Sequence, residues 1–205
     1  MDRRLIVFVK APRLGRAKTR LSRDIGAVEA CRFYRVETAR LLRRLAPDPR
    51  WRTVVAVSPD GERGRIGTGL DPWPASILRM PQGPGDLGRR MERCLLTGHA
   101  GPQVLIGSDI PAIGPDHVER AFRALGNAPA VFGPAEDGGF WLIGLARASL
   151  ARGLFNGVRL STPHALEDTL ARLINRLPVR LVDRLADIDT GADLARWRGH
   201  RSGNP

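Results

Sequence analysis

Five basic side chains lie in the short segment 10–20, and they are Lys10, Arg13, Arg16, Lys18 and Arg20. The segment follows the apolar run Leu5–Val9, whose β-branched and aromatic residues predict a buried strand. Pro12 and Gly15 prevent it from continuing as strand or helix, and Gly15 lets the backbone approach a ligand closely. Because crowded like charges repel one another, the segment is better suited to binding an anion than to lying free. We interpret it as a phosphate-binding loop without the Walker A glycines, and a solvated basic loop is the alternative.

A carboxylate stands where a second apolar strand, predicted over Gln103–Pro111, leaves the sheet. This residue is Asp109, and Ile110 and Pro111 prevent the chain from becoming helical at once. A carboxylate in such apolar surroundings needs a partner. Coordination of a metal ion is the favoured partner, and a helix cap or a backbone N–H is the alternative.

Two more carboxylates flank an isoleucine late in the chain, at Asp187 and Asp189. In an extended segment, residues two apart project to the same side, so both carboxylates can point at one cation while Ile188 faces the core. The alternative for Asp189 is that it caps the last helix. Thr190 and Asp193 have the spacing of a capping box for that helix.

An acidic turn, Glu136-Asp137-Gly138-Gly139, separates two apolar runs at 130–135 and 140–145. Its two glycines indicate either a backbone that comes close to another group or a hairpin turn. Phe140 and Trp141 follow, and they could wall a substrate pocket or belong to the core.

Together these residues describe one kind of chemistry. Cations neutralise phosphate oxygens, and carboxylates hold a divalent ion that bridges those oxygens, which suits group transfer at a nucleotide pyrophosphate linkage. The sequence contains no GxSxG, and its GxGxxG spacing at residues 83–88 does not follow the first strand, where a dinucleotide-binding turn would lie, so hydrolase and dehydrogenase chemistry has little support.

The remaining pattern supplies the elements that position these groups. Helices are predicted at about 27–45, from the turn 82–91 to about 96, at 115–125, at 163–175 and after 187. Further strands are predicted at 53–58, 75–80 and 179–183, with a loop through Pro74. Strands alternate with helices, so we expect an α/β fold with three αβα layers and a mostly parallel sheet, with ligands outside the carboxyl ends of the strands.

The 205 residues fit a single domain, which we place at 1–198, with a frayed tail at 199–205. The composition is that of a soluble globular protein, and neither a signal peptide nor a membrane span is expected, so we predict a cytoplasmic location. Cys31 and Cys94 are interpreted as core residues and not as a disulfide or zinc site. A net charge of +12 raises nucleic acid as a partner, but no recognition module accompanies it and only weak, non-specific binding is expected.

Five motifs in order give the chain a resemblance to a known family. FVKAPRLGRAKTRL, GDLGRRM, LIGSDIP, GPAEDGGFWLIGL and DIDTGADL are similar to those of a bacterial transferase family related to 2-phospho-lactate guanylyltransferase. Members are often labelled glycosyltransferases associated with radical-SAM or selenium-related genes. Gly191 and Ala192 depart from the family's more frequent DIDTPEDL ending. The resemblance implies the glycosyltransferase-A fold of nucleotide-diphospho-sugar transferases, with a nucleotide over the first loop.

The resemblance also implies roles for individual residues. Lys18 and Asp109 are the expected catalytic residues, and Mg²⁺ or Mn²⁺ is expected on Asp109, Asp187 and Asp189. The acceptor is expected at Asp137, Gly138 and Gly139. The residues expected to bind the nucleotide and its phosphates are Lys10, Ala11, Pro12, Gly15, Arg16, Lys18, Arg20, Gly85 and Asp86. The family label favours glycosyl transfer to a small acceptor, whereas the dense cations favour nucleotidyl transfer from a nucleoside triphosphate to a small phosphorylated acceptor, and both remain open.

Overall fold

A computed structural model describes residues 2–61, 73–74, 76–173 and 176–202 of the chain. The strands are β1 (Arg4–Lys10), β2 (Arg52–Ser58), β3 (Leu78–Pro81), β4 (Gln103–Gly107), β5 (Ala130–Pro134), β6 (Phe140–Leu145) and β7 (Val179–Leu181). The helices are α1 (Thr19–Ile25), α2 (Ala27–Leu45), α3 (Leu87–Leu96), α4 (Pro115–Ala124), the 3₁₀ helix η2 (Ala148–Ala151), α5 (Ala165–Leu173) and α6 (Gly191–Ser202).

The strands form one sheet of seven in the order β3-β2-β1-β4-β6-β5-β7. β1 pairs in parallel with β2 and β4, aligning Phe8 with Ala56 and with Gly107. β6 is antiparallel to both of its neighbours, because β5 and β6 are joined by a short hairpin that leaves no room for a crossover. The expected α/β fold with a mostly parallel sheet is therefore confirmed.

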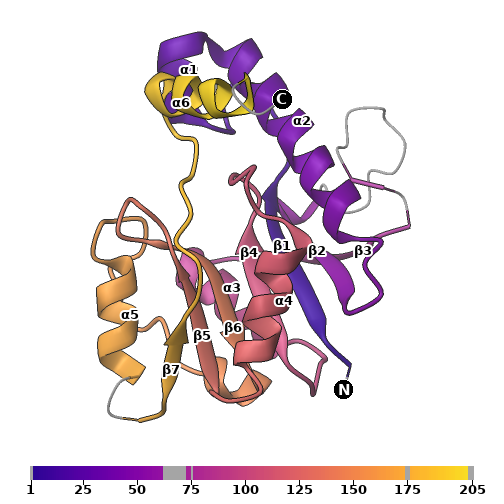
Figure 1. The fold of residues 1–205 in the computed structure, drawn as a ribbon, viewed down its shortest axis with the longest axis vertical. Coiled ribbons are helices and arrows are strands. Elements are labelled where there is room, and N and C mark those ends of the chain that lie inside the picture. Colours follow the sequence, from indigo (N-terminus) through magenta and orange to yellow (C-terminus); the bar gives the residue numbers. More distant parts are fainter. Residues whose placement is uncertain (1, 62–72, 75, 174–175, 203–205) are drawn as a thin grey trace.

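Helices cover both faces of this sheet, as Figure 1 shows for α4 in front and α3 behind. Successive side chains of a strand point to opposite faces. Accordingly Leu5, Val7 and Val9 of β1 belong to the core cluster that includes α2 and α4 residues, whereas Ile6 belongs to the cluster that includes α3 and α5 residues. The three predicted layers follow from this alternation.

Several element boundaries differ from the sequence prediction. Helix α1 begins at Thr19, inside the segment predicted to be a loop, because Leu21 has an apolar site to fill between α2 and α6. The strand predicted to run to Pro111 ends at Gly107, and the helix predicted over 163–175 covers Ala165–Leu173. Of the loop predicted before Pro74, residues 62–72 lie outside the described residues, as does residue 75 of the predicted strand.

The chain returns to the carboxyl ends of the parallel strands after β7. The yellow segment in Figure 1 climbs past the sheet from β7 and ends in α6, beside α1 and α2. Trp197 of α6 meets Phe33 of α2 edge-to-face, with ring centroids 5.7 Å apart. The predicted capping box is present, because Thr190 Oγ1 accepts from Asp193 N–H at 3.2 Å while the Asp193 carboxylate accepts from Thr190 N–H at 2.8 Å.

The proposed domain 1–198 stays a prediction. Helix α6 continues to Ser202 and so includes the first residues of the expected tail, while residues 203–205 lie outside the described residues.

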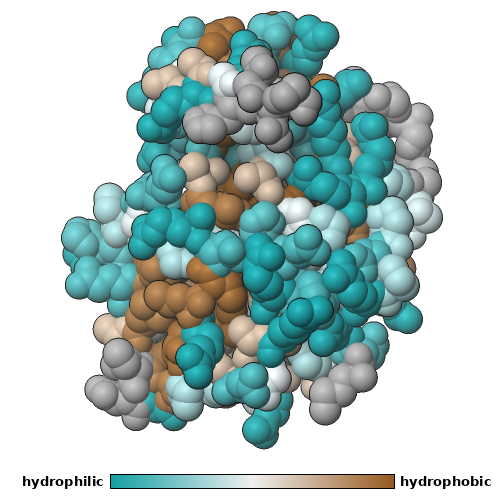
Figure 2. Space-filling model, in the orientation of Figure 1, coloured by the Kyte–Doolittle hydropathy of each residue, from teal (hydrophilic) through white to brown (hydrophobic). Residues whose placement is uncertain are grey.

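Apolar side chains gather on one area of the molecular surface, over the strands at the β7 side of the sheet (Figure 2). Val182 and Leu185 are only partly buried against the core cluster of that face. Within the described ranges, no helix has the combination of length and apolar character that a membrane span requires.

Candidate active site

A basic cavity of about 380 Å³ opens at the carboxyl ends of β1 and β4. The cationic residues that line it are Lys10, Arg16, Lys18, Arg20 and Arg90. Four of these belong to the predicted phosphate-binding segment, and the fifth comes from α3. The structure therefore gathers the positive charge at the sheet edge where α/β proteins bind ligands.

Lys18 is the central side chain of the basic cavity. It adopts a left-handed backbone conformation, with φ of 50°, immediately before α1. Its side chain is only 5% exposed, and Nζ lies 2.7 Å from the Asp189 carboxylate and 3.1 Å from that of Asp109. Burial opposes its charge, but the attraction of both carboxylates holds the pKa of Lys18 above its ordinary value. A left-handed non-glycine residue costs free energy, and such residues cluster at functional sites.

The hydroxyl groups of Tyr34 and Ser108 form a hydrogen-bonded pair at the end of β1, where the first loop begins. The Tyr34 hydroxyl accepts from Lys10 N–H at 2.9 Å and lies 3.0 Å from Ser108 Oγ. Burial raises the pKa of Tyr34, so the phenol stays neutral and can take part in both bonds. This contact fixes the end of β1 relative to the residue before Asp109.

Arg90 is a cavity residue that sequence reasoning missed. Buried Gln82 donates through Nε2 to the carbonyls of Val9 and Ala56, both at 2.9 Å. Its Oε1 then accepts from Arg90 at 3.0 Å, which aims the guanidinium at the cavity. The signal was available, because Arg90 lies in the GDLGRRM motif at the fourth helical position of α3.

The other residues of the predicted phosphate set lie around the cavity and do not line it. Ala11 is buried and its N–H donates to the Ser58 carbonyl at 2.8 Å, while Pro12 is half-buried. Gly15 is exposed, and a Cβ there would meet nothing within 4 Å. A glycine is favoured at this position because the backbone φ is 69°, which other residues rarely adopt. Gly85 also has a positive φ, and Asp86 caps α3 by accepting from Arg89 N–H at 2.8 Å. Asp86 is therefore the N-cap of α3, where a carboxylate also suits the helix dipole.

An acidic chamber of about 230 Å³ adjoins the basic cavity and shares Leu87, Gly107 and Asp109 with it. Its remaining lining residues are Met91, Ile110, Ala135, Asp137, Gly139, Phe140, Trp141, Leu160, Ser161, Thr162, Ala165 and Asp187. Three of the predicted aspartates therefore meet here, although they are far apart in the sequence.

The two late aspartates serve different cavities. Asp189 lines the basic cavity, whereas Asp187 lines the acidic chamber. Ile188 between them is 3% exposed and packs with Leu21, as expected for an extended segment with its isoleucine in the core. Burial and the neighbouring carboxylates, above all Asp189, raise the pKa of Asp187 to about 6.

The acidic turn after β5 is a hairpin turn and also a close approach of two backbones. Asp137 accepts from Gly139 N–H at 2.8 Å. Gly138 has φ of 86°, and a Cβ at this position would lie 2.1 Å from the Pro163 carbonyl oxygen. Both interpretations of the two glycines were therefore correct. Trp141 likewise combines two roles, since it is 3% exposed in the core and still lines the acidic chamber.

The carboxylates suit a divalent metal by chemistry but are not preassembled around one. Carboxylate oxygens are the ligands that Mg²⁺ and Mn²⁺ favour, and burial together with the neighbouring carboxylates raises the pKa of Asp187. Within the described residues, no three carboxylate, imidazole or thiol groups lie close enough together to hold a metal ion. The ammonium of Lys18 lies between Asp109 and Asp189 instead.

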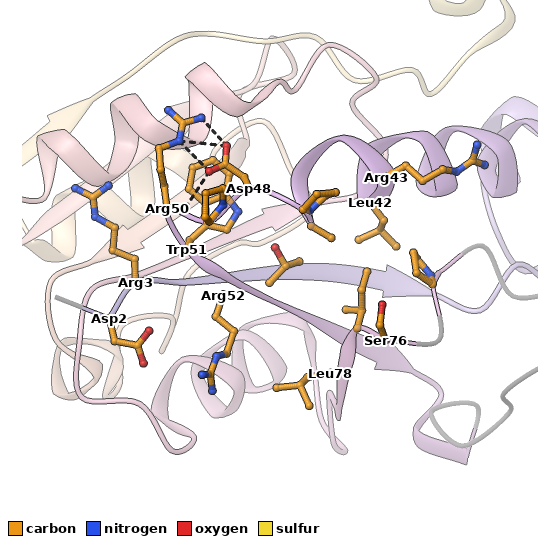
Figure 3. A pocket seen from close by; sticks show the side chains of 16 residues that line it. Asp2, Arg3, Leu42, Arg43, Asp48, Arg50, Trp51, Arg52, Ser76 and Leu78 are labelled. Carbon is orange, nitrogen blue, oxygen red and sulfur yellow. Dashed lines mark hydrogen bonds and ion pairs between the residues drawn. The ribbon is translucent and has the colours of Figure 1, made fainter.

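A larger cavity of about 870 Å³ lies at the opposite, amino ends of the strands (Figure 3). Two of its arginines are engaged with neighbouring carboxylates, since Arg50 bonds Asp48 and Arg3 bonds Glu119 at 2.8 Å. It is lined neither by Lys18, with its left-handed backbone, nor by the carboxylates of Asp109 and Asp189. The candidate site is therefore at the carboxyl ends of the strands.

Solved structures share this fold. A protein from Desulfovibrio desulfuricans G20, classed with the nucleotide-diphospho-sugar transferases, is 28% identical with a TM-score of 0.86, over 100% of this chain and 90% of that one. The 4-diphosphocytidyl-2C-methyl-D-erythritol synthase of Anaerococcus prevotii is 10% identical, with a TM-score of 0.64 over 98% and 96% of the two chains. A cytidylyltransferase from Leptospira borgpetersenii is 14% identical, with a TM-score of 0.62 over 100% and 88%. The fold is therefore that of the nucleotide-diphospho-sugar transferases.

Sequence comparison adds the family. No curated protein matches the chain. One family model matches residues 41–162, which include the second, third and fourth of the five motifs and most of the acidic chamber. The chain therefore belongs to the bacterial family described as "Uncharacterized protein conserved in bacteria (DUF2064)".

Proposed function

We propose that this protein is a metal-dependent transferase that uses a nucleotide sugar and transfers its glycosyl group to a small acceptor. The observation that carries the proposal is the junction of two cavities at Asp109, one basic and one acidic. The basic cavity supplies cations for a diphosphate, and the adjoining chamber supplies hydrogen-bond acceptors for a sugar. The D. desulfuricans protein is named after the nucleotide-diphospho-sugar transferases, and this name supports a reaction of the same class.

The chain's own residues account for binding the diphosphate. Lys18, Arg20 and Arg90 reach the basic cavity from three directions, namely the end of the loop, the start of α1 and the middle of α3. Charge-assisted contacts of this kind contribute about 1.5–3 kcal/mol each. Lys18 has two alternative sets of partners, the carboxylates that it contacts now and the phosphates of a bound nucleotide, so ligand binding would free Asp109 and Asp189.

Asp109, Asp187 and Asp189 would hold the metal, as the sequence predicts, and a bound Mg²⁺ or Mn²⁺ would neutralise charge on the departing diphosphate. In the reaction, the bond from the anomeric carbon to the diphosphate breaks and a bond to the acceptor oxygen forms. The acceptor loses its proton, and the nucleoside diphosphate is the second product.

Nucleotidyl transfer is the second candidate, and the five cations of the basic cavity favour it. In this reaction, the acceptor oxygen attacks the α-phosphorus of a nucleoside triphosphate and pyrophosphate leaves, so more negative charge must be neutralised. The names of the A. prevotii and L. borgpetersenii proteins indicate cytidylyl chemistry, and the suggested relation to 2-phospho-lactate guanylyltransferase belongs to this candidate.

A thermal-shift screen of nucleoside triphosphates against nucleotide sugars, each with Mn²⁺, separates the two reactions. A ligand at a hundred times its Kd stabilises a protein by about 2.7 kcal/mol. Glycosyl transfer predicts stabilisation by a nucleotide sugar above that given by the nucleoside diphosphate of the same base. Selective stabilisation by a triphosphate, followed by release of pyrophosphate, would reject it.

A further inference from the structure

The structure assigns a substrate class to the acidic chamber: it binds an uncharged, hydroxyl-rich group and rejects a phosphorylated one. The inference rests on the proposed function and decides what lies next to the nucleotide phosphates. In glycosyl transfer this group is the donor sugar, and in nucleotidyl transfer it is the acceptor.

Positive and negative side chains are divided unequally between the two cavities. Asp109, Asp137 and Asp187 line the acidic chamber, and no lysine, arginine or histidine among the described residues lines it. A phosphate in the chamber would therefore be desolvated beside like charges with no cation in contact.

A bound divalent metal does not reverse this argument. The chamber carboxylates of Asp109, Asp137 and Asp187, when ionised, carry one negative charge more than a divalent ion can neutralise. In the proposed function, the ion is also shared with the nucleotide phosphates. The chamber thus stays negative or close to neutral, and it does not become an anion site.

The chamber also offers polar and apolar groups that match a sugar. Hydroxyl groups of a sugar donate to carboxylates, and the Ser161 and Thr162 side chains add two further polar groups. Phe140 also lines the chamber, and an apolar ring suits the C–H face of a sugar ring. Phe140 is held there by ring contacts to Phe132 and Phe155, with centroids 5.4 and 6.4 Å apart.

The charge preference can be measured without knowing the acceptor. Ser161→Cys places a thiol on the chamber wall, and Cys31→Ser removes the part-exposed native thiol, while Cys94 is fully buried. The full-length variant is treated with methanethiosulfonates that carry a trimethylammonium or a sulfonate group. The rate of each reagent with the protein is divided by its rate with a free thiol. The corrected rate of the trimethylammonium reagent divided by that of the sulfonate reagent is the cation preference.

Ser149→Cys in the same background is the matched control, because Ser149 is an exposed serine on η2 that lines neither cavity. We expect the cation preference of the Ser161→Cys variant to exceed that of the Ser149→Cys variant by about tenfold at low ionic strength. Adding Asp137→Asn to the Ser161→Cys variant should reduce its preference, since the charge is lost while the amide oxygen can still accept from Gly139 N–H. Equal preferences in the two thiol variants, or faster reaction of the chamber thiol with the sulfonate reagent, would overturn the inference.

A protection experiment tests the hydroxyl-rich group itself. The nucleotide sugar that stabilises the protein most should slow modification of the chamber thiol more than the nucleoside diphosphate of the same base does. Equal protection by the two ligands would contradict the inference. If no nucleotide stabilises the protein, the proposed function fails, whereas the reagent rates still report whether the chamber excludes anions.

Discussion

Replacing Asp187 by asparagine should stabilise the metal-free protein at neutral pH. The carboxyl group lies among other carboxylates, and burial together with Asp189 raises its pKa from 3.8 to about 6. Keeping the Asp187 carboxylate ionised in the folded state would cost about 3 kcal/mol if the full rise of its pKa, from 3.8 to about 6, lowered the free energy of unfolding. Because the side chain is only part-buried, solvent screening reduces the expected gain of Asp187→Asn to about 1–2 kcal/mol.

The sign of the pH dependence follows from the same values. Between about pH 4 and pH 6 the folded state keeps a proton that the unfolded state has lost, so wild-type stability falls as pH rises through this window. Above pH 6 the cost is constant, and below pH 4 it is absent. The advantage of Asp187→Asn should therefore be full at pH 7.5 and close to zero at pH 4.

Thermal or urea unfolding in EDTA measures this difference. For a chain of this length, 1–2 kcal/mol corresponds to a rise in Tm of about 2–8 °C. Asp116→Asn is the control, because Asp116 is an exposed aspartate outside both cavities and its removal should give no gain. An unchanged or lowered Tm for Asp187→Asn at pH 7.5, or the same gain at both pH values, would refute the reasoning.

Two further substitutions have matched controls. Arg90→Ala should weaken nucleotide binding by about tenfold or more in calorimetry, whereas Arg89→Ala on the neighbouring position should leave it unchanged because Arg89 does not line the basic cavity; equal effects would remove Arg90 from the site. Gly138→Ala should cost more than about 2 kcal/mol of unfolding free energy, since its Cβ would meet the Pro163 backbone. Gly157→Ala, with a similar positive φ and free space, should cost only about 1–2 kcal/mol, and a larger loss than for Gly138→Ala would contradict the packing argument.

The sequence was sufficient for the architecture because its signals are local. Apolar strands alternate with amphipathic helices, and the spacing of Asp187, Ile188 and Asp189 correctly placed the isoleucine in the core. Strand ends also indicated that Lys18 and Asp109 would share one cavity, since they follow strands that are direct neighbours in the sheet. Periodicity and strand order carry this information without any knowledge of side-chain contacts.

Other features depend on contacts between distant segments and could not be read locally. Helix α1 forms because Leu21 packs against Ile188, which is far away in the sequence. Arg90 is held at the basic cavity in part by Gln82, whose own partners are backbone carbonyls of β1 and β2. The separation of Asp187 from Asp189 into two cavities likewise depends on where the acidic turn after β5 lies, and local spacing does not show this.

The central claim is that Lys18 and a divalent metal bind nucleotide phosphates together. Calorimetric titration of the nucleotide selected by the thermal-shift screen, with Mg²⁺ and with EDTA, tests it on wild type, Lys18→Ala and Lys18→Asn. Asparagine tolerates the left-handed backbone of this position, so it separates loss of charge from loss of fold, and exposed Arg23→Ala is the charge control. We predict that both Lys18 variants weaken binding by about ten- to a hundredfold in Mg²⁺, and that wild type loses affinity in EDTA. Equal affinity with and without metal, or unchanged binding by both folded Lys18 variants, would contradict the account.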